Sequence, residues 1–552
     1  MRVLLVSTPH PLEEAPLPPL SLAYLAASLE QHGIDVEILD FLVTRYTPEK
    51  LRRKLADYRP HLVGVTCVTL NYPRASRILR TCRAYDPSIT TLIGGPHVTF
   101  ALGETLLKSP WIDAIVIGEG ETTLVEIATA LEQGNDFHQV PGIAFADANK
   151  VVKTEPRPLI QDLDKLPMPA RQLLPLARYR ALGMPSTVIT SRGCPYRCIF
   201  CSGRRMFGPK VRFRDAGLVV DEIEQIHRDF GFPRVNIVDD TFTLNHRHAG
   251  QVCEELLRRN LKVKWAAFAR ADTVTAELAE LMKRAGCDFV LFGVESADEG
   301  ILKTIRKGIT LEVVEHGVKT ATGAGIMVFN SFILGLPGES PETARHSMAF
   351  AQRLDHEYGA KYGFHVLSPI PGTELYERAG DYGLRILSRN WARYDANQPV
   401  TVTATMTVDM VKEIVGEYDV LMQGLHEDTK RRAEAGDAQC AEVVAEKEGR
   451  EFVWGLLNGD VIEKLGPQSA AVAAHSDAAE AKLAQRVSRK LGIPIEVAQQ
   501  RMRTLVADGS LRLEQRSDGA RWRWSDVPPL AAGTGNALAA TKPQRLTATV
   551  RS

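Results

Sequence analysis

The sequence predicts an α/β protein with two successive series of strands and helices, followed by a helical C-terminal region. Short apolar runs that are rich in β-branched residues recur along roughly the first two thirds of the chain. The segments between them are long enough for amphipathic helices. With 552 residues, the chain also exceeds the size of one hydrophobic core, so several domains are expected.

The first series occupies residues 1–142. Helix-length segments such as 19–33 and 72–86 separate its apolar runs. Alternating strands and helices form parallel units, so this series predicts a Rossmann-like, doubly wound domain. The expected strands are 2–7, 35–40, 62–68, 90–95 and 114–120. A hairpin and a proline-rich linker are expected in the connecting segment, residues 143–182.

The second series occupies residues 183–395 and predicts a partial (β/α)6 barrel of the TIM type. Its expected strands are 186–193, 234–240, 264–270, 289–296, 327–335 and 362–369. In such barrels the chemistry lies at the carboxyl ends of the strands. Five residues that carry candidate chemistry lie at or just past these ends, namely Cys194, Asp240, Arg270, Glu295 and Gly335.

The pattern then changes to helices. We expect a helical extension over residues 396–465 and a winged-helix-like module over residues 466–525, because helix, turn, helix and a two-stranded wing follow one another there. The last residues, 526–552, show no periodicity and are expected to be disordered.

Composition narrows the classes of function. Lysine plus arginine and aspartate plus glutamate both number 67, so the formal net charge is zero and nothing points to nucleic acid. The short apolar start is followed by acids and prolines, and no apolar run is long enough to span a membrane. Eight cysteines in a chain of this length are not a disulfide framework, so a reducing cytoplasm is expected.

Three of those cysteines lie close together in "SRGCPYRCIFCSG", residues 191–203. The spacing leaves open a structural zinc site or unrelated buried cysteines. A zinc site usually has a fourth cysteine or histidine close by, but the nearest downstream candidates are His227 and Cys253. Thiolates also ligate iron–sulfur cubanes. Three protein ligands, Cys194, Cys198 and Cys201, would leave one iron of a [4Fe–4S] cluster open.

The motif "CPYRCIFC" resembles the C-x3-C-x-φ-C motif of the radical S-adenosylmethionine (SAM) superfamily, with Phe200 as the aromatic residue φ. The resemblance implies that the open iron chelates SAM and that reductive cleavage yields a 5′-deoxyadenosyl radical. Glu295 and Arg270 match positions that contact SAM in this family, although either could be a structural charge. Residues 332–340 resemble the family's strand near adenine without its leading glycine, and Ser331 and Gly335 are assigned to that contact.

The first domain resembles the cobalamin-binding domain that precedes many radical SAM enzymes. Polar and small residues end three of its successive strands and would line one edge of the sheet. The positions that we carry over to cobalamin are Thr66, Thr69, Asn71, Gly94, Gly95, His97, Glu119 and Gly120. The cobalt-ligating D-x-H-x-x-G motif of other cobalamin domains is absent. His97 therefore fits contact with the nucleotide tail better than ligation, and Asn71 or no residue would face the cobalt. A sheet that has lost cobalamin is the alternative.

Together the two domains resemble cobalamin-dependent radical SAM enzymes over residues 1–395. The resemblance implies methylation of an unactivated carbon of a small-molecule or peptide substrate through methylcobalamin, with flavodoxin or ferredoxin as reductant. Asp240 would orient substrate or ligands, or else serve as a helix cap or ion-pair partner.

One alternative reaction is oxidation or cyclisation, as in the anaerobic magnesium-protoporphyrin ester cyclase. A second is a non-catalytic sensor with a DNA-binding winged helix. The substrate and the oligomeric state are left open.

Overall fold

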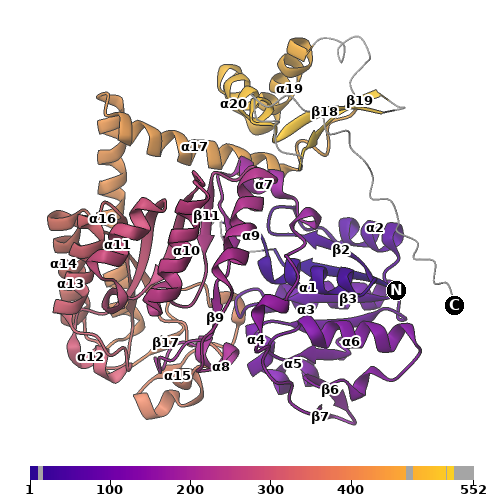
Figure 1. Cartoon of the computed structure of the whole chain (residues 1–552), viewed down its shortest axis with the longest axis horizontal. Helices are drawn as coiled ribbons and strands as arrows, with labels where there is room; N and C mark the ends of the chain where they lie inside the picture. Colours follow the sequence, from indigo (N-terminus) through magenta and orange to yellow (C-terminus); the bar gives the residue numbers. More distant parts are fainter. Residues whose placement is uncertain (10–15, 468–475, 517–518, 527–552) are drawn as a thin grey trace.

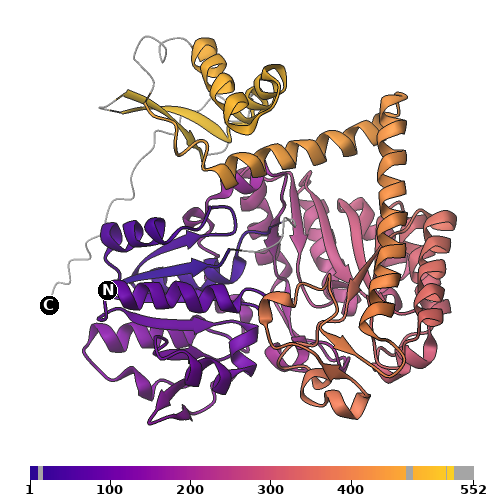
Figure 2. The same cartoon turned by 180° about the vertical axis from the view of Figure 1, so that it is seen from behind.

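The computed structural model describes residues 1–9, 16–467, 476–516 and 519–526. Two α/β domains lie side by side, the first in indigo and purple and the second in magenta and pink (Figure 1). A long helical arm crosses the second domain to a small C-terminal module, and the view from behind shows the same arrangement (Figure 2). Nearly all of the expected disordered tail, residues 527–552, lies outside the described part of the chain.

The first sheet has the strand order β2-β1-β3-β4-β5-β6-β7 and is parallel from β2 to β5. Alternate residues of β1 face two separate cores: Leu4 packs with helices on one face and Leu5 with helices on the other. Burial of both faces is typical of a parallel sheet between helices. The strands are β1 (Arg2–Ser7), β2 (Asp35–Asp40), β3 (Leu62–Thr66), β4 (Thr90–Gly94) and β5 (Ala114–Val116). The helices are α1 (Leu20–Gln31), α2 (Pro48–Tyr58), α3 (Tyr72–Tyr85), α4 (Pro96–Phe100), α5 (Leu102–Lys108) and α6 (Glu121–Glu132).

The hairpin lies at the start of residues 143–182, as the sequence predicts, but its pairing with the first sheet was not predicted. Strand β6 (Ile143–Asp147) pairs antiparallel with β5, and β7 (Lys150–Lys153) follows β6. The hairpin thus extends the first sheet. The reason is that β5 would otherwise expose a row of unpaired backbone groups at the sheet edge.

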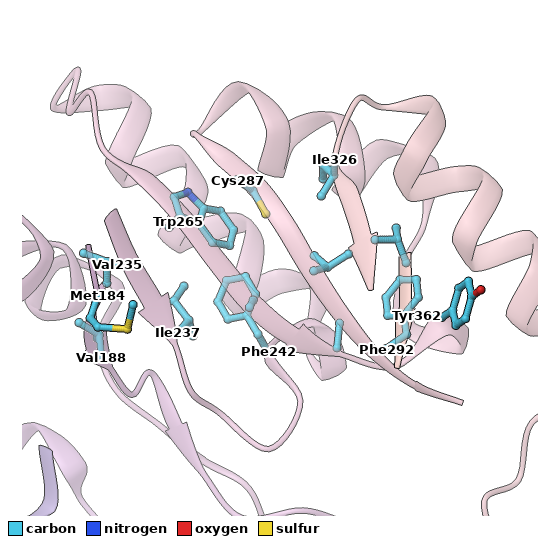
Figure 3. Packing of buried hydrophobic residues seen from close by; sticks show 14 of the residues in the cluster. Met184, Val188, Val235, Ile237, Phe242, Trp265, Cys287, Phe292, Ile326 and Tyr362 are labelled. Atoms are coloured by element: carbon cyan, nitrogen blue, oxygen red, sulfur yellow. The ribbon is translucent and has the colours of Figure 1, made fainter. Parts of the chain in front are cut away.

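The second sheet has the order β15-β14-β13-β12-β11-β8, with neighbouring strands parallel. Strands that follow one another in space as in sequence form a partial barrel, as predicted. Trp265 and Phe292 pack toward the surrounding helices (Figure 3), whereas Phe268 on the opposite face is 39% exposed. The strands are β8 (Ser186–Val188), β11 (Arg234–Ile237), β12 (Lys264–Ala269), β13 (Cys287–Glu295), β14 (Met327–Leu334) and β15 (Lys361–Val366).

The helices of the second domain begin where the sequence supplies caps. The Asp215 carboxylate accepts from the backbone N–H of Gly217 at 2.8 Å, and Ser340 forms a capping box with Thr343. The helices are α8 (Gly203–Phe207), α9 (Ala216–Arg228), α10 (His246–Arg258), α11 (Ala276–Arg284), α12 (Glu299–Thr304), α13 (Leu311–Gly323), α14 (Pro341–Tyr358) and α15 (Glu374–Glu377).

The C-terminal region is helical, and its last part has the helix–turn–helix and two-stranded wing expected from the sequence. Two contacts attach this module to α7 (Leu176–Ala181): the Ala177 N–H donates to Asp526 at 2.7 Å, and Arg180 donates to the Ser525 carbonyl at 2.8 Å. The arm is α16 (Val408–Glu434) and α17 (Ala438–Gly459), and the module is α19 (Ser476–Leu491), α20 (Ile495–Ala507), β18 (Leu511–Arg516) and β19 (Gly519–Trp524). Within the described ranges, no helix has both the length and the apolar character needed to cross a membrane.

Candidate functional site

The three cysteines lie in a loop whose base is closed by hydrogen bonds. The expected first strand of the barrel is split, because a short strand β9 (Ser191–Arg192) leaves the sheet and pairs with β10 (Arg212–Phe213). The Cys194 N–H donates to the Gly208 carbonyl at 3.1 Å, and the Cys201 N–H donates to the Cys198 carbonyl at 3.3 Å. Gly193 has a φ of 111°, and a Cβ there would lie 2.7 Å from the Lys210 carbonyl oxygen. The loop therefore requires glycine at its entrance.

The middle of the loop is held from two sides. The Ile199 N–H donates to the Ile305 carbonyl at 3.2 Å, and the Ile199 carbonyl accepts from the Leu375 N–H at 2.9 Å. Phe200, the aromatic position of the motif, is half-buried against the hydrophobic core. These contacts fix the backbone between the second and third cysteines.

The thiol donor set fits an iron–sulfur cluster. Partial desolvation by the surrounding protein raises the pKa values of Cys194, Cys198 and Cys201, although Cys201 is exposed at the surface, so metal binding would have to displace protons. Across the part of the chain that the structure describes, no three His, Cys, Asp or Glu side chains form a group that could hold one metal ion. Each thiolate of a cubane binds a different iron, so the sulfurs need not converge as they do on a single zinc ion.

Two aspartates follow β11 and have different surroundings. The buried Asp239 carboxylate accepts from the N–H groups of Thr190 at 2.7 Å and Ser191 at 3.2 Å, so it fixes the turn that leads into the cysteine loop. Asp240 lies against the start of α8, where a Cβ on Gly203 would be 2.9 Å from its Oδ1. Asp240 is exposed, but partial desolvation by the surrounding protein and the charge of the neighbouring Asp239 raise its pKa.

Arg270 extends from the end of β12 toward the cysteine loop. Its guanidinium forms two hydrogen bonds with Asp272, at 2.9 and 3.0 Å, and a third with the Lys307 carbonyl at 2.9 Å. It also stacks over the Tyr196 ring, 3.7 Å from the ring centroid. Tyr196 lies between the first two cysteines, so Arg270 is held beside the loop.

Sequence reasoning missed Tyr196, Asp272 and Lys307. Lys307 donates to Glu295 at 2.7 Å, and both side chains are buried. The sequence offered one signal, the basic pair that precedes Gly308. Nothing in the local sequence shows that a member of this pair contacts a strand end twelve residues earlier.

The carboxyl end of β14 contains the two positions that we assigned to adenine. Ser331 is half-buried and lies opposite Gly293 of β13. Gly335 has a φ of 90°, and its N–H donates to the Glu339 carboxylate. Glu339 is fully buried, and this burial raises its pKa to about 7. The hydrogen bond to this buried carboxylate therefore fixes the turn after β14.

A cavity of about 490 Å³ lies between the two domains. Residues from both domains line it, so the carboxyl edge of the first sheet and the base of the cysteine loop face one space. Six of our eight cobalamin positions are among its lining, namely Thr66, Asn71, Gly94, Gly95, Glu119 and Gly120. Ser191, Arg192, Met206 and Asp240 contribute from the second domain.

The first-domain wall of this cavity fits a large cofactor lying against the backbone. At Gly95, where φ is 107°, a Cβ would lie 2.3 Å from the Cys67 carbonyl oxygen, so the chain can turn here only without a side chain. The Thr8 hydroxyl lines the cavity and is buried with no hydrogen-bond partner among the residues that the structure describes, so it is available to a ligand. Val68, 45% exposed, adds apolar surface to the lining. Sequence reasoning missed Thr8 and Val68, although both adjoin strand ends.

Glu119 also lines the cavity but is already engaged. Its carboxylate accepts from Arg192 at 2.9 Å, from Arg212 at 3.0 Å and from the Ile160 N–H at 2.7 Å. Burial opposes its charge, but hydrogen bonds from the two arginines keep the pKa of Glu119 below its usual value. Arg192 also pairs with Glu121 at 2.6 Å. This network joins the first domain to β9 and β10, which form the base of the cysteine loop.

Thr69 and His97 do not line the cavity. His97 is 1% exposed, its Nδ1 lies 3.2 Å from the Thr69 hydroxyl, and its ring packs between Tyr72 and Trp391 at centroid distances of 4.5 and 5.1 Å. His97 therefore packs between the first domain and the segment that follows the barrel strands.

This burial predicts a pH effect on stability. Burial lowers the pKa of His97 to about 4, whereas a histidine in the unfolded chain has a pKa of about 6.5. The unfolded state therefore binds the proton first, and stability is lost as pH falls from the unfolded value toward the folded one. Between about pH 7.5 and about pH 5, the wild type should lose about 2 kcal/mol more unfolding free energy than His97→Gln. Denaturant unfolding at both pH values measures this difference, and equal losses would contradict it.

A partial barrel whose first strand leads into a three-cysteine loop defines the class of radical SAM enzymes, and the comparisons agree. Residues 188–351 match the radical SAM superfamily, and residues 14–128 match the B12 binding domain. An uncharacterized methyltransferase of Pyrococcus horikoshii is 36% identical over 400 residues, which are 72% of this chain and 86% of the relative. The chain belongs to the cobalamin-binding radical SAM enzymes, a family that includes methyltransferases.

Three further comparisons support this placement. The anaerobic magnesium-protoporphyrin IX monomethyl ester cyclase of Rubrivivax gelatinosus is 33% identical over 376 residues, and the match covers 66% of each chain. The methyltransferase TsrM of Kitasatospora setae, solved with cobalamin and a [4Fe–4S] cluster, matches with a TM-score of 0.59 and 25% identity over 74% of this chain and 84% of that chain. The cobalamin-dependent radical enzyme OxsB shares the fold, with a TM-score of 0.65 and 18% identity over 92% of this chain and 80% of that one. The cofactors of this chain are therefore a [4Fe–4S] cluster, SAM and cobalamin.

Proposed function

We propose that this enzyme methylates an unactivated carbon of a small-molecule or peptide substrate. The observation that carries the proposal is the interdomain cavity, where the glycine-lined edge of the cobalamin domain faces the base of the cysteine loop and Asp240. When bound, the cluster and SAM supply a carbon-centred radical and cobalamin supplies a methyl group. Cobalamin would thus lie across this cavity from the base of the loop that would hold the cluster.

The residues of the chain then have separable tasks. Cys194, Cys198 and Cys201 would hold the cluster and leave one iron for SAM. Arg270 and Glu295 would bind polar groups of SAM, because both are fixed charges beside the cysteine loop. The turn after β14, with Ser331 and Gly335, would receive adenine. The buried links between Arg192 and the two glutamates of the first domain would keep the domains in register and exclude water from the cavity between them.

Cobalamin contact is proposed for the six cavity-lining positions named above and for Thr8. His97 is better assigned to packing than to cobalt, because it is enclosed by Tyr72 and Trp391. Asp240 would contact substrate, since it lines the cavity and lies against α8. The electron donor would be a flavodoxin or ferredoxin, and a reducing cytoplasm would suit both the cluster and the free cysteines.

The test is an anaerobic assay with reconstituted enzyme, SAM, cobalamin and a low-potential reductant, applied to a panel of metabolites and peptides. We expect a product that is heavier by one methylene unit and that takes up deuterium from SAM labelled in its methyl group. Omitting cobalamin should stop methylation while 5′-deoxyadenosine still forms. A product with a new ring or hydroxyl group and no added methyl would instead assign the cyclase type of reaction, which the Rubrivivax relative favours.

A further inference from the structure

We propose that Lys307 is a positioning residue that holds the Glu295 carboxylate in the orientation in which it binds SAM. This inference rests on the proposed assignment of Glu295 to SAM. The Lys307 ammonium donates to Glu295 Oε1 at 2.7 Å, and the two side chains are 7% and 9% exposed. A buried carboxylate needs a partner, because burying a lone charge is strongly unfavourable. Lys307 supplies that partner from a loop rather than from a neighbouring strand.

The backbone at Glu295 is shaped around this pair. Glu295 has a φ of 74°, which is unusual for a residue with a side chain, and the pairing of β13 with β14 shifts register between Gly293 and Glu295. A Cβ on Gly293 would lie 2.5 Å from Glu295 Oε1 and 2.9 Å from Lys307 Nζ. Strand β13 thus has a glycine at position 293, where a side chain would collide with the ion pair, and a strained backbone at Glu295 itself. Such strain persists where the surroundings fix it, which is common at functional sites.

The Lys307 loop also joins the other parts of the expected SAM site. The Lys307 carbonyl accepts from Arg270 at 2.9 Å, and the Ile305 carbonyl accepts from the Ile199 N–H inside the cysteine loop at 3.2 Å. One short turn therefore contacts Glu295, Arg270 and the cluster loop. An ion pair that served stability alone would need neither the contact with Arg270 nor the contact with the cysteine loop. Buried ion pairs are also often no more stabilising than apolar side chains of similar volume. The geometry therefore favours a role in placing Glu295.

The first experiment compares SAM binding by the anaerobically reconstituted wild type, Lys307→Met and the control Arg306→Gln. Arg306 is the adjacent cation, 47% exposed, and pairs with Glu374 outside this group. Equilibrium dialysis of labelled SAM with the oxidised cluster measures affinity without turnover. We expect Lys307→Met to bind SAM about tenfold more weakly at unchanged iron content, and Arg306→Gln to bind like the wild type. The change that SAM causes in the electron paramagnetic resonance spectrum of the reduced cluster should weaken in parallel.

Two further variants separate this inference from the proposed function. Glu295→Gln should weaken SAM binding, and the double variant Glu295→Gln/Lys307→Met should bind SAM no worse than Glu295→Gln. The double variant removes both buried charges, so it leaves no unpaired charge in the site and tests whether Lys307 acts on SAM only through Glu295. Normal binding by Glu295→Gln would overturn the assignment of Glu295, and the inference with it. Weakening by Glu295→Gln together with normal binding by Lys307→Met, or a double variant weaker than Glu295→Gln, would overturn the inference while the proposed function stands.

Discussion

Replacement of Cys194, Cys198 or Cys201 by alanine is expected to abolish reductive cleavage of SAM. In the proposed site each thiolate would bind a separate iron, and two ligands would not keep a cubane in place with one iron open to SAM. The hydrogen bonds at the base of the loop cannot compensate, because they fix the backbone and supply no ligand. We expect iron and sulfide content to fall to near background after anaerobic reconstitution. Formation of 5′-deoxyadenosine from SAM, measured with reductant, should disappear with them.

The matched control is Cys440→Ala, which removes a buried cysteine from α17, outside the cysteine loop. It should retain full iron content and SAM cleavage. Retention of SAM cleavage by the triple alanine variant would contradict the cluster assignment, as would zinc in place of iron in protein purified without oxygen.

Substitution of Gly95 by alanine is expected to have the next largest effect, because two penalties act at one position. The φ of 107° is disfavoured for any residue with a side chain, and the new Cβ would lie 2.3 Å from the Cys67 carbonyl oxygen. The end of β4 would have to move away from β3, and both ends line the cavity. We expect a loss of about 3 kcal/mol or more in the free energy of unfolding. Cobalamin retained after gel filtration, measured by its visible absorption, should fall strongly.

Gly134→Ala separates strain from collision. Gly134 has a φ of 71°, but no atom of the described residues lies within 4 Å of the Cβ position, and Gly134 does not line the cavity. Gly134→Ala should lower the free energy of unfolding by about 1 kcal/mol and leave cobalamin binding unchanged. Equal losses of stability and unchanged cobalamin binding in the two variants would contradict the role of Gly95 in shaping the cavity.

Most of the fold class followed from local patterns. Apolar runs of strand length, separated by helix-length segments, predicted both sheets, and the three-cysteine spacing predicted the loop after the first barrel strand. These signals are readable because strand and helix periods repeat within a few residues. The hairpin 143–153 shows the limit, since its pattern predicted two paired strands but contained nothing about the β5 edge that they would cover.

The candidate site divides in the same way. Sequence order placed Arg270 and Glu295 at strand ends, but their fixed orientations come from Asp272 and Lys307, which match no motif. The glycines at the edge of the first sheet were predicted, whereas the burial of His97 behind that edge depends on Trp391, almost three hundred residues later.

The sequence by itself determined the order of elements, the cluster motif and the residues able to line a cofactor site. Only the tertiary structure decided which of them face one cavity and which cavity-lining residues are already engaged in ion pairs, as Glu119 is with Arg192 and Arg212. The physical reason is the separation in sequence over which each interaction acts. Backbone preference and amphipathic spacing act between residues that are close in sequence. Buried charges pair with residues tens to hundreds of positions away, because only the packed fold brings them together.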